Sequence, residues 1–504
     1  MKTFLVVSLL IIACEAFNET YRPQFHFTPA RGWMNDPNGL VYVKEQDGTG
    51  WYHLFYQYNT LGEKSPGNIG WGHAKSQDLV HWDRLPQALF PGEKFYIFSG
   101  SAVQIEGTDT VCLLYTGMND VTKIQNQNLA FSPDGGEKFL EFTKNPVIDL
   151  KKTEFRDPKI FSYKTEDGRS YYVMAVVLPD VFTVQFYKST DFIAWELLSE
   201  FTMDTKAIWE CPDLFEMSVG PNKKWVLTFS LQSKEVSKTV YYVGDFDGTK
   251  FTLDPSFSTQ PVPIDHGSDF YAAVTYENEP QQRRIMIGWL GNWEYSTTSP
   301  TDPWRCSQSI PRMLELKNID NQYKLYSTPI PELTKLRKTS WTFSGKPVIS
   351  AGSPTVVSFP KDIDTRHCEI ELELQIPISS RPPDKVGIQV LRNEAGEENT
   401  LIYYDIKTKN VVVDRSKSGN VKFSDRFLSV VSEQNVPLRE IIKFHIFVDA
   451  SSVEVFVNDG EAVLSSILFP NQKSTTMSVI CDGQAATFTI VKKFVVHPLT
   501  SIWE

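Results

Sequence analysis

The amino-acid sequence predicts an all-β protein, in which a five-bladed β-propeller is followed by a C-terminal β-sandwich. Three observations lead to this prediction. Helical periodicity is almost absent, and the 504 residues include 33 Phe, 20 Tyr and 12 Trp, whose rings favour β-strands. Similar groups of short apolar runs return at intervals of 55 to 57 residues in the first part of the chain. Beyond residue 346, longer runs of strict apolar and polar alternation replace them.

The N-terminus has the pattern of a secretory signal peptide. Lys2 precedes an apolar run over residues 4–13, and we expect cleavage after Ala16. A membrane anchor would need about 20 apolar residues, so the run is too short for one. A lipoprotein signal that ends at Cys14 is the alternative. We therefore assign residues 1–16 to a signal peptide and expect a secreted, extracellular protein that has no membrane attachment after signal removal.

Charge and cysteine content exclude several classes of partner. The net charge of -11 repels phosphate backbones, which argues against nucleic-acid binding. The absence of any C-x-x-C pair argues against a zinc site. Once Cys14 leaves with the signal, an odd number of cysteines remains, of which Cys368 and Cys481 could pair. Asn18 begins the sole N-glycosylation sequon.

The repeat is defined by turn sequences that close four successive strand groups. These turns begin at Ser76, Ser132, Ser189 and Gly244, at spacings of 56, 57 and 55 residues. The apolar runs before them are residues 52–58, 111–115, 171–177 and 225–229, and a weaker fifth copy covers residues 284–326. Several strands per unit of this length indicate the blades of a propeller. A β-sandwich with coincidental spacing is the weaker reading, because three intervals nearly agree.

Domain boundaries follow from the change in pattern. We assign residues 20–335 to the propeller, 336–345 to a linker and 346–504 to the sandwich. The sandwich assignment depends on strict alternation, which is typical of two packed antiparallel sheets. The alternating runs are residues 369–376, 386–391, 401–406, 442–448 and 453–457.

Acidic residues begin the first strand of three repeat copies. The innermost strand of each blade lines the central channel, and these strands begin with residues 33–39 (WMNDPNG), 98–101 (FSGS), 155–158 (FRDP), 209–213 (WECPD) and 269–271 (DFY). Asp36, Asp157 and Glu210 occupy equivalent places in their copies, so we expect the three carboxylates to converge at one channel mouth.

Each motif taken alone has a simpler explanation. The sequence after Asn35 is a type I turn signature, Arg156 and Asp157 resemble a surface ion pair, and Glu210 resembles a strand end. Three carboxylates that share one site are costly to bury, so the set needs a functional reason.

The chemistry that fits this set is glycoside hydrolysis, which needs one ionised carboxylate and one protonated acid. Trp209 and Cys211 flank Glu210, and an apolar environment raises the pKa of a carboxyl group. We expect Asn35 and the turn amides to keep Asp36 ionised. We expect Arg156 to pair with Asp157 and to keep it ionised as well.

These motifs resemble glycoside hydrolase family 32, which holds invertases, exo-inulinases, levanases and fructosyltransferases. The resemblance extends from residue 24 to the end of the chain. It includes residues 33–39, 52–59 (YHLFYQYN), 71–73 (WGH), 98–100 (FSG), 155–158, 210–212 (ECP), 269–273 (DFYAA), 292–293 (NW) and 449–456 (DASSVEVF). It implies the same two-domain fold, and retaining hydrolysis of β-fructofuranosides without a metal or a cofactor.

The resemblance also implies roles for individual residues. Asp36 is the expected nucleophile, Glu210 the acid and then the base, and Asp157 the stabiliser of the transition state. The fructose pocket is expected to contain Asn35, Gln57, Trp71, Phe98, Ser99, Arg156 and Trp293. His53, His73 and His81 are candidate bases, but their strand and turn positions favour structural roles.

The expected substrate is sucrose or a fructan, from which terminal fructosyl units are released. Sucrose, inulin and levan all present such a unit, so the preference among them stays open, as does the oligomeric state. Two other functions are retained: a fructosyltransferase that uses sucrose as donor, and a non-catalytic sugar-binding propeller. The second ranks lower because all three acids are present.

Overall fold

The computed structural model describes residues 17, 19–62, 65–377, 382–428 and 432–503. The expected signal peptide and the Asn18 sequon lie outside the described residues. Within the described part, no helix is both long enough and apolar enough to cross a membrane.

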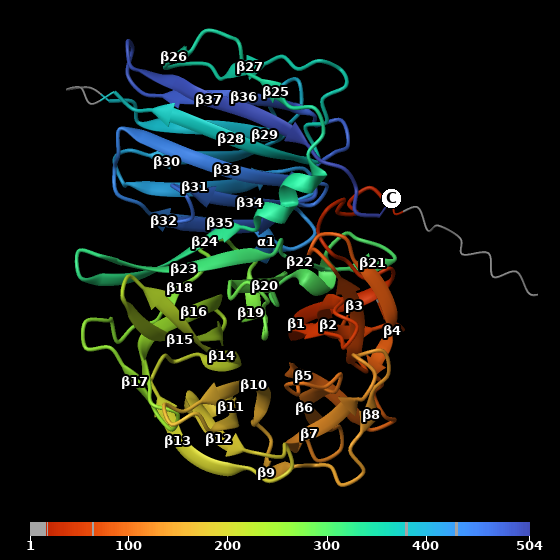
Figure 1. Ribbon diagram of the computed structural model, residues 1–504. Coiled ribbons are helices and arrows are strands. Elements are labelled where there is room, and N and C mark those ends of the chain that lie inside the picture. Colours follow the sequence, from red (N-terminus) through yellow and green to blue (C-terminus); the bar gives the residue numbers. More distant parts are fainter. Residues whose placement is uncertain (1–16, 18, 63–64, 378–381, 429–431, 504) are drawn as a thin grey trace, which may run out of the picture.

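Five sheets surround a common centre, with the innermost strands β1, β5, β10, β14 and β19 toward it, and their strands are antiparallel except for the β1–β21 pair (Figure 1). The first sheet contains β1 (Gly32–Lys44), β2 (Gly50–Asn59), β3 (Gly70–Ser76), β4 (Asp83–Leu89) and β21 (Trp304–Arg305). The second contains β5 (Phe95–Gln104), β6 (Val111–Asn119), β7 (Gln125–Ser132), β8 (Leu140–Glu141) and β9 (Ile148–Lys152). The third contains β10 (Arg156–Lys164), β11 (Ser170–Leu178), β12 (Thr183–Ser189) and β13 (Glu196–Thr202).

The last two blades complete the ring. The fourth sheet contains β14 (Ile208–Val219), β15 (Asn222–Gln232), β16 (Ser237–Phe246), β17 (Phe251–Leu253) and β18 (Val262–Pro263). The fifth contains β19 (Tyr271–Thr275), β20 (Arg284–Leu290), β22 (Ser307–Gln308), β23 (Arg312–Ile319) and β24 (Gln322–Pro329). Strand β21 leaves this part of the chain and pairs in parallel with β1, which closes the propeller.

Three of the four turn sequences that define the repeat begin at the last residue of a blade's third strand, and the fourth begins inside β16. Ser76 ends β3, and its hydroxyl accepts a hydrogen bond from the Asp78 amide at 3.1 Å. Ser189 ends β12 and accepts the Asp191 amide at 3.2 Å in the same way. Such side-chain bonds to the backbone stabilise tight turns, which explains why Ser and Asp recur at these positions.

Two further sheets form the predicted C-terminal sandwich. One contains β25 (Trp341–Thr342), β26 (Val348–Ser350), β28 (Cys368–Gln375), β33 (Ile441–Asp449), β34 (Ser452–Val457), β35 (Ala462–Ile467) and β37 (Phe488–Pro498). The other contains β27 (Thr355–Val357), β29 (Lys385–Arg392), β30 (Asn399–Asp405), β31 (Asn410–Lys417), β32 (Ser432–Asn435) and β36 (Thr476–Asp482). Their facing apolar side chains form one continuous core.

Helical structure is confined to short pieces in the described residues. These are the 3₁₀ helices η1 (Pro179–Val181), η2 (Ser296–Thr298) and η3 (Pro331–Leu336), and the α-helix α1 (Asp425–Leu428). The five cysteines in the described part are free thiols, so Cys368 and Cys481 do not form a disulfide bond in this structure.

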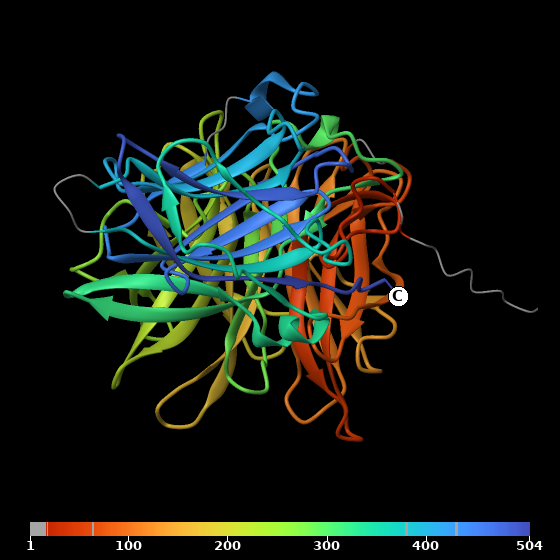
Figure 2. The same cartoon turned by 90° about the horizontal axis from the view of Figure 1, so that it is seen from above.

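The sandwich packs on the fifth blade and on the N-terminal segment, as two views of the molecule show (Figures 1 and 2). Buried charged side chains lie in this contact. His26 lies between Asp449, at 2.7 Å, and Glu454, at 2.9 Å. Arg312 of β23 forms ion pairs with Asp265, at 2.8 Å, and with Glu454. The contact therefore contains buried ion pairs beside apolar side chains, and Glu454 binds both His26 and Arg312.

Candidate active site

The three predicted acids lie at β-bulges near the start of innermost strands. The register of β1 against β2 shifts between Met34 and Pro37, and Asp36 lies in that shift. Strand β10 shifts between Arg156 and Lys159, around Asp157. Strand β14 shifts after Glu210. A bulge redirects side chains relative to the regular ladder, so it allows a strand to aim a carboxylate into the channel.

Local sequence explains why the bulges form at these positions. A proline follows each acid within two residues, and a proline has no amide hydrogen for the ladder. Asp157 and Cys211 also adopt left-handed backbone angles, with φ of 61° and 48°. This conformation is unfavourable for residues other than glycine and is concentrated at functional sites.

Cys211 shows that the acids converge. Its sulfur lies 3.5 Å from Oδ2 of Asp36 and 3.7 Å from Oδ2 of Asp157. Its amide also donates a hydrogen bond of 2.9 Å to Asp157. Carboxylates from the first and third blades therefore contact one residue of the fourth blade, next to Glu210.

Besides the Cys211 thiol, two side chains donate hydrogen bonds to Asp36. Ser99 donates from Oγ to Oδ2 at 2.7 Å, and Asn35 donates from Nδ2 to Oδ1 at 2.9 Å. Burial raises the pKa of Asp36, the Ser99 and Asn35 bonds lower it, and the charge of Glu210 raises it further, with a net upward shift. Asn35 lowers this pKa in the predicted direction, but burial outweighs the bonds from Asn35 and Ser99, so a net downward shift of the Asp36 pKa is not found.

Asp157 differs from the prediction in the same way. Burial raises the pKa of Asp157 to about 7, although the positive charge of Arg156 opposes the shift. The negative charges of Glu210 and Asp36 contribute to the increase. Arg156 directs its guanidinium to another carboxylate, so the predicted ion pair with Asp157 was wrong.

Glu210 is the partner that Arg156 binds. Nε and Nη2 of the guanidinium donate to Oε1 of Glu210 at 3.2 and 3.0 Å, and Tyr271 donates from Oη to Oε2 at 2.5 Å. The Trp209 ring does not surround the Glu210 carboxyl. Its fully buried ring stacks on Phe229 with a centroid distance of 3.9 Å, in the core between blades. The expected apolar contribution of Trp209 to Glu210 was therefore wrong.

The predicted pocket residues form a support around Asp36. Gln57 donates to the Ser99 hydroxyl at 3.0 Å, and Trp71 donates to the Phe98 carbonyl at 3.0 Å. Trp33 holds the Asn35 side chain at 2.7 Å. Trp293 stacks on Trp33 with a centroid distance of 6.0 Å and an interplanar angle of 20°.

Three residues that bind side chains or backbone of the site were not among the candidates predicted from the sequence. Tyr271 binds Glu210, Glu154 binds Arg156, and Gln308 donates to the Asn35 carbonyl at 2.7 Å. Tyr271 could have been found, because it begins the innermost strand of the fifth blade at a place equivalent to the acids. Gln308 lies on β22 and had no such signal.

The histidines have the predicted structural roles. His53 and His73 lie 2.9 Å apart, and burial lowers the pKa of His53 to about 3. Burial also lowers the pKa of His73 well below its usual value. His81 binds Asp78 in the turn after β3.

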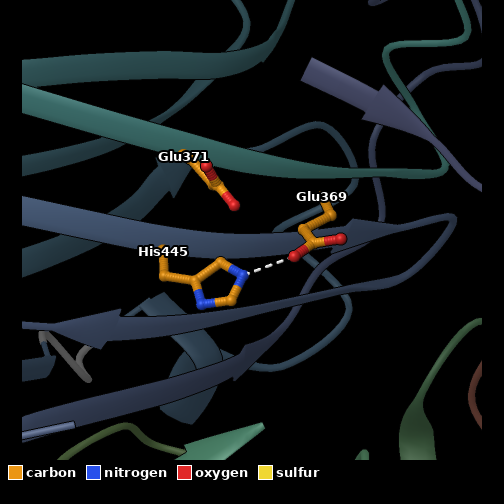
Figure 3. A group of neighbouring side chains, drawn as sticks. All are labelled: Glu369, Glu371 and His445. Atoms are coloured by element: carbon orange, nitrogen blue, oxygen red, sulfur yellow. Dashed lines mark hydrogen bonds and ion pairs between the residues drawn. The ribbon is translucent and has the colours of Figure 1, made fainter. Parts of the chain in front are cut away.

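A separate group of titratable residues lies in the sandwich, where Glu369, Glu371 and His445 face one another (Figure 3). Arg337 binds Glu369 at 2.5 Å, and Lys493 forms an ion pair with Glu371. Since cations already neutralise both carboxylates, this group is an ion-pair network.

Fold and site together define a glycosidase, because carboxylates in different environments at one channel mouth are what glycosidic bond cleavage requires. The chain belongs to the glycosyl hydrolases family 32. The N-terminal domain of that family matches residues 26–329, and its C-terminal domain matches residues 332–498.

Relatives cover nearly the whole chain. It is 37% identical over 511 residues to a levanase of Bacillus subtilis (strain 168), a match that covers 97% of this chain and 72% of the relative. It is 34% identical over 556 residues to an extracellular exo-inulinase of Aspergillus niger, with 100% and 99% covered.

Solved structures agree with the fold. An exo-inulinase from Aspergillus awamori matches with a TM-score of 0.86 at 30% identity, covering 97% of this chain and 100% of the other. A fructofuranosidase from Schwanniomyces occidentalis, solved with fructose, matches with a TM-score of 0.85 at 27% identity, covering 96% and 99%. The predicted family and fold class are confirmed.

Proposed function

We propose that the protein is an exo-acting β-fructofuranosidase, which releases terminal β-D-fructofuranosyl units from sucrose or fructans with retention of configuration. The observation that supports it most is the convergence of Asp36 and Glu210 in a chain related to a levanase and to exo-inulinases. Two carboxyl groups with different partners are the minimum set for this reaction.

In the first step, an Asp36 oxygen attacks the anomeric carbon of fructose and forms an ester bond. The bond from that carbon to the leaving-group oxygen breaks, and Glu210 gives its proton to the departing oxygen. In the second step, Glu210 takes a proton from water, whose oxygen attacks the same carbon and frees Asp36.

The contacts of Glu210 indicate which oxygen holds that proton. Arg156 can donate hydrogen bonds but has no acceptor, so Oε1 of Glu210 serves as an acceptor only. The proton therefore belongs on Oε2, where the Tyr271 hydroxyl can rotate from donor to acceptor. Burial and the charge of Glu210 raise the pKa of Tyr271 well above its usual value, so its hydroxyl keeps its own proton.

The remaining predicted residues are assigned to substrate binding. Asp157 accepts hydrogen bonds from fructose hydroxyls, and such bonds strengthen as the transition state forms. Asn35, Phe98, Ser99, Arg156 and Trp293 line the fructose pocket. Gln57 and Trp71 are buried and support Ser99 and Phe98 from behind.

The proposal includes export through removal of residues 1–16 and gives the propeller and sandwich the boundaries 20–335 and 346–504. The extracellular exo-inulinases among the relatives support export. N-terminal sequencing of protein recovered from the culture medium tests it: a start after Ala16 agrees with the proposal, and a retained leader contradicts it.

The function is tested with purified protein and sucrose, inulin or levan as separate substrates. We expect free fructose as the first product from at least one of them, without intermediate-sized fragments. Larger fragments would indicate internal cleavage, and the absence of fructose from all three would refute the proposal. At high sucrose concentration, the ratio of glucose to fructose measures transfer to sugar relative to hydrolysis.

A further inference from the structure

Arg156 is shared between two carboxylates of different exposure. Its Nε and Nη2 donate to Glu210 at 3.2 and 3.0 Å, whereas Nη1 donates to Glu154. The Arg156 side chain is 11% exposed, that of Glu210 20%, and that of Glu154 38%. Glu154 therefore lies toward the solvent side of the guanidinium, and Glu210 lies on the inner side.

Other groups around Glu210 come from four strands. Asp36 belongs to β1, Asp157 and Arg156 to β10, Cys211 to β14 and Tyr271 to β19. Gln125 of β7 also accepts from Nη1 of Arg156, at 3.4 Å. Within the described residues, Glu210 forms its ion pair with Arg156. The charge on this one guanidinium therefore matters more than any other cation to the ionisation of Glu210.

We propose that Glu154 is a positioning residue of the active site, which acts through Arg156 and sets how much of the positive charge Glu210 receives. This inference rests on the proposed function of Glu210 as the acid. Glu154 itself need not contact the substrate.

The direction of the effect follows from charge. A carboxylate on Nη1 balances part of the guanidinium charge, and its own negative charge also opposes ionisation of Glu210. Both effects favour the protonated form of Glu210, which is the form that can assist a leaving group. Removal of the Glu154 charge therefore lets Glu210 lose its proton at a lower pH.

The test is the pH dependence of kcat/KM for Glu154→Gln, which removes the charge and keeps the size and one acceptor oxygen. We expect the alkaline limb to move to lower pH by about 0.5 unit, as suits a partly exposed charge. Glu154→Asp, which keeps the charge, should restore most of the wild-type limb. An unchanged limb, or a move to higher pH, would overturn the proposal.

Glu216→Gln is the matched control. Glu216 lies on β14, is 39% exposed and also pairs with a cation, Lys223, but it is at the other end of the strand from Glu210. We expect no shift of the alkaline limb in this variant. An equal shift in Glu216→Gln would show that net charge alone is responsible and would overturn the proposal.

A second measurement needs no substrate. The Glu210 side-chain carboxyl carbon is followed by ¹³C NMR during a pH titration and is assigned by its loss in Glu210→Gln. We expect the midpoint to be lower in Glu154→Gln than in the wild type, and an equal midpoint would contradict the proposal. This titration remains decisive even if the wild-type protein releases no fructose, an outcome that would refute the proposed function alone.

Discussion

Arg156 binds Glu210 of the neighbouring blade and not Asp157, its neighbour in the sequence. The reason lies in the β10 bulge, where Asp157 has a left-handed backbone with φ of 61° that directs its side chain differently from that of Arg156. The guanidinium is therefore placed beside the proposed acid, while Asp157 turns toward Cys211 and Asp36. The cation and the phenol of Tyr271 together hold both oxygens of Glu210.

Replacement of Asp36 by alanine should remove hydrolysis and leave the fold intact. The nucleophile is lost, so we expect kcat to fall by a factor on the order of 10⁴ or more. Because burial disfavours the ionised form of Asp36, the thermal midpoint should not decrease. The check is kcat with the best substrate, together with a thermal melt. An active purified Asp36→Ala protein would exclude Asp36 as the nucleophile.

The first product should be the β anomer of fructose. A retaining enzyme places its two carboxyls about 5 to 5.5 Å apart and uses one as the nucleophile. Proton NMR during the first minutes, before mutarotation, separates the anomers. Early accumulation of α-fructose would mean direct attack by water and would remove the covalent step from the mechanism.

The pH profile of activity should be bell-shaped with an acidic optimum. The Asp36 carboxylate must be ionised and Glu210 protonated, and the pKa of Asp36 is raised while that of Asp157 is raised to about 7. The acid limb of the profile, where activity is lost as the pH falls, should therefore lie at a higher pH than it would for a nucleophile with the pKa of an ordinary aspartate. The apparent pKa values of the profile belong to the coupled set of carboxyl groups and not to single residues. Glu210→Gln should flatten the alkaline limb, and an optimum above about pH 8 would point to another acid.

Tyr271→Phe should move the alkaline limb to higher pH. The phenol donates to Oε2 of Glu210 and so stabilises its ionised form. A hydrogen bond to a charged group is worth about 1.5 to 3 kcal/mol and one to the protonated acid about 0.5 to 1.5 kcal/mol, so the difference corresponds to a shift of about one pH unit. The direction is opposite to that expected for Glu154→Gln. A shift to lower pH in Tyr271→Phe would show that this hydroxyl does not stabilise the carboxylate.

His26→Ala should destabilise the contact between the two domains. His26 is buried between Asp449 and Glu454, and its loss leaves two buried carboxylates less compensated. Breaking a buried ion pair costs about 3 to 5 kcal/mol. Urea unfolding measures the loss, with His81→Ala, on an exposed turn, as the control. An equal small effect of both substitutions would show that the ion pairs of His26 contribute little.

The same histidine makes wild-type stability depend on pH. Burial alone would lower the pKa of His26, but its bonds to Asp449 and Glu454 raise it to about 9. A group whose pKa is raised on folding stabilises the protein fully below its unfolded pKa of about 6.5. That contribution, about 3 kcal/mol, is lost as the pH rises toward 9. Unfolding free energies at pH 6 and pH 9 should differ accordingly, and His26→Ala should abolish this part of the difference.

The sequence was sufficient for the architecture and for the place of the acids. The turns at Ser76 and Ser189 are alike because both use the same side-chain bond to the backbone, and the acids recur at the start of equivalent strands. Partners across blades were not predictable. Arg156 and Glu210 are 54 residues apart, and Tyr271 lies 61 residues beyond Glu210 on the fifth blade, so local sequence does not show that these side chains meet.

The ion pairs at the domain contact and the pKa shifts caused by burial could not be predicted from the sequence either. His26 meets Asp449 across 423 residues, so its ion pairs depend on how the domains dock. The raised pKa of Asp36 depends on burial, which is a property of the assembled channel mouth. The turn sequence around Asp36 indicated Asn35 as a donor but neither Ser99 nor the larger cost of removing the carboxylate from water.

The most direct test of the mechanism is to trap the fructosyl-enzyme. Fructosyl fluoride needs no acid to depart, so Glu210→Ala should complete the first step and stall before the second, which needs the base. We predict that intact-protein mass spectrometry shows a gain of one anhydrofructose unit, located by peptide mapping on Asp36 and absent from the Asp36→Ala, Glu210→Ala double variant. A label on Asp157 or any other residue, or consumption of the donor with no label at all, would contradict the account.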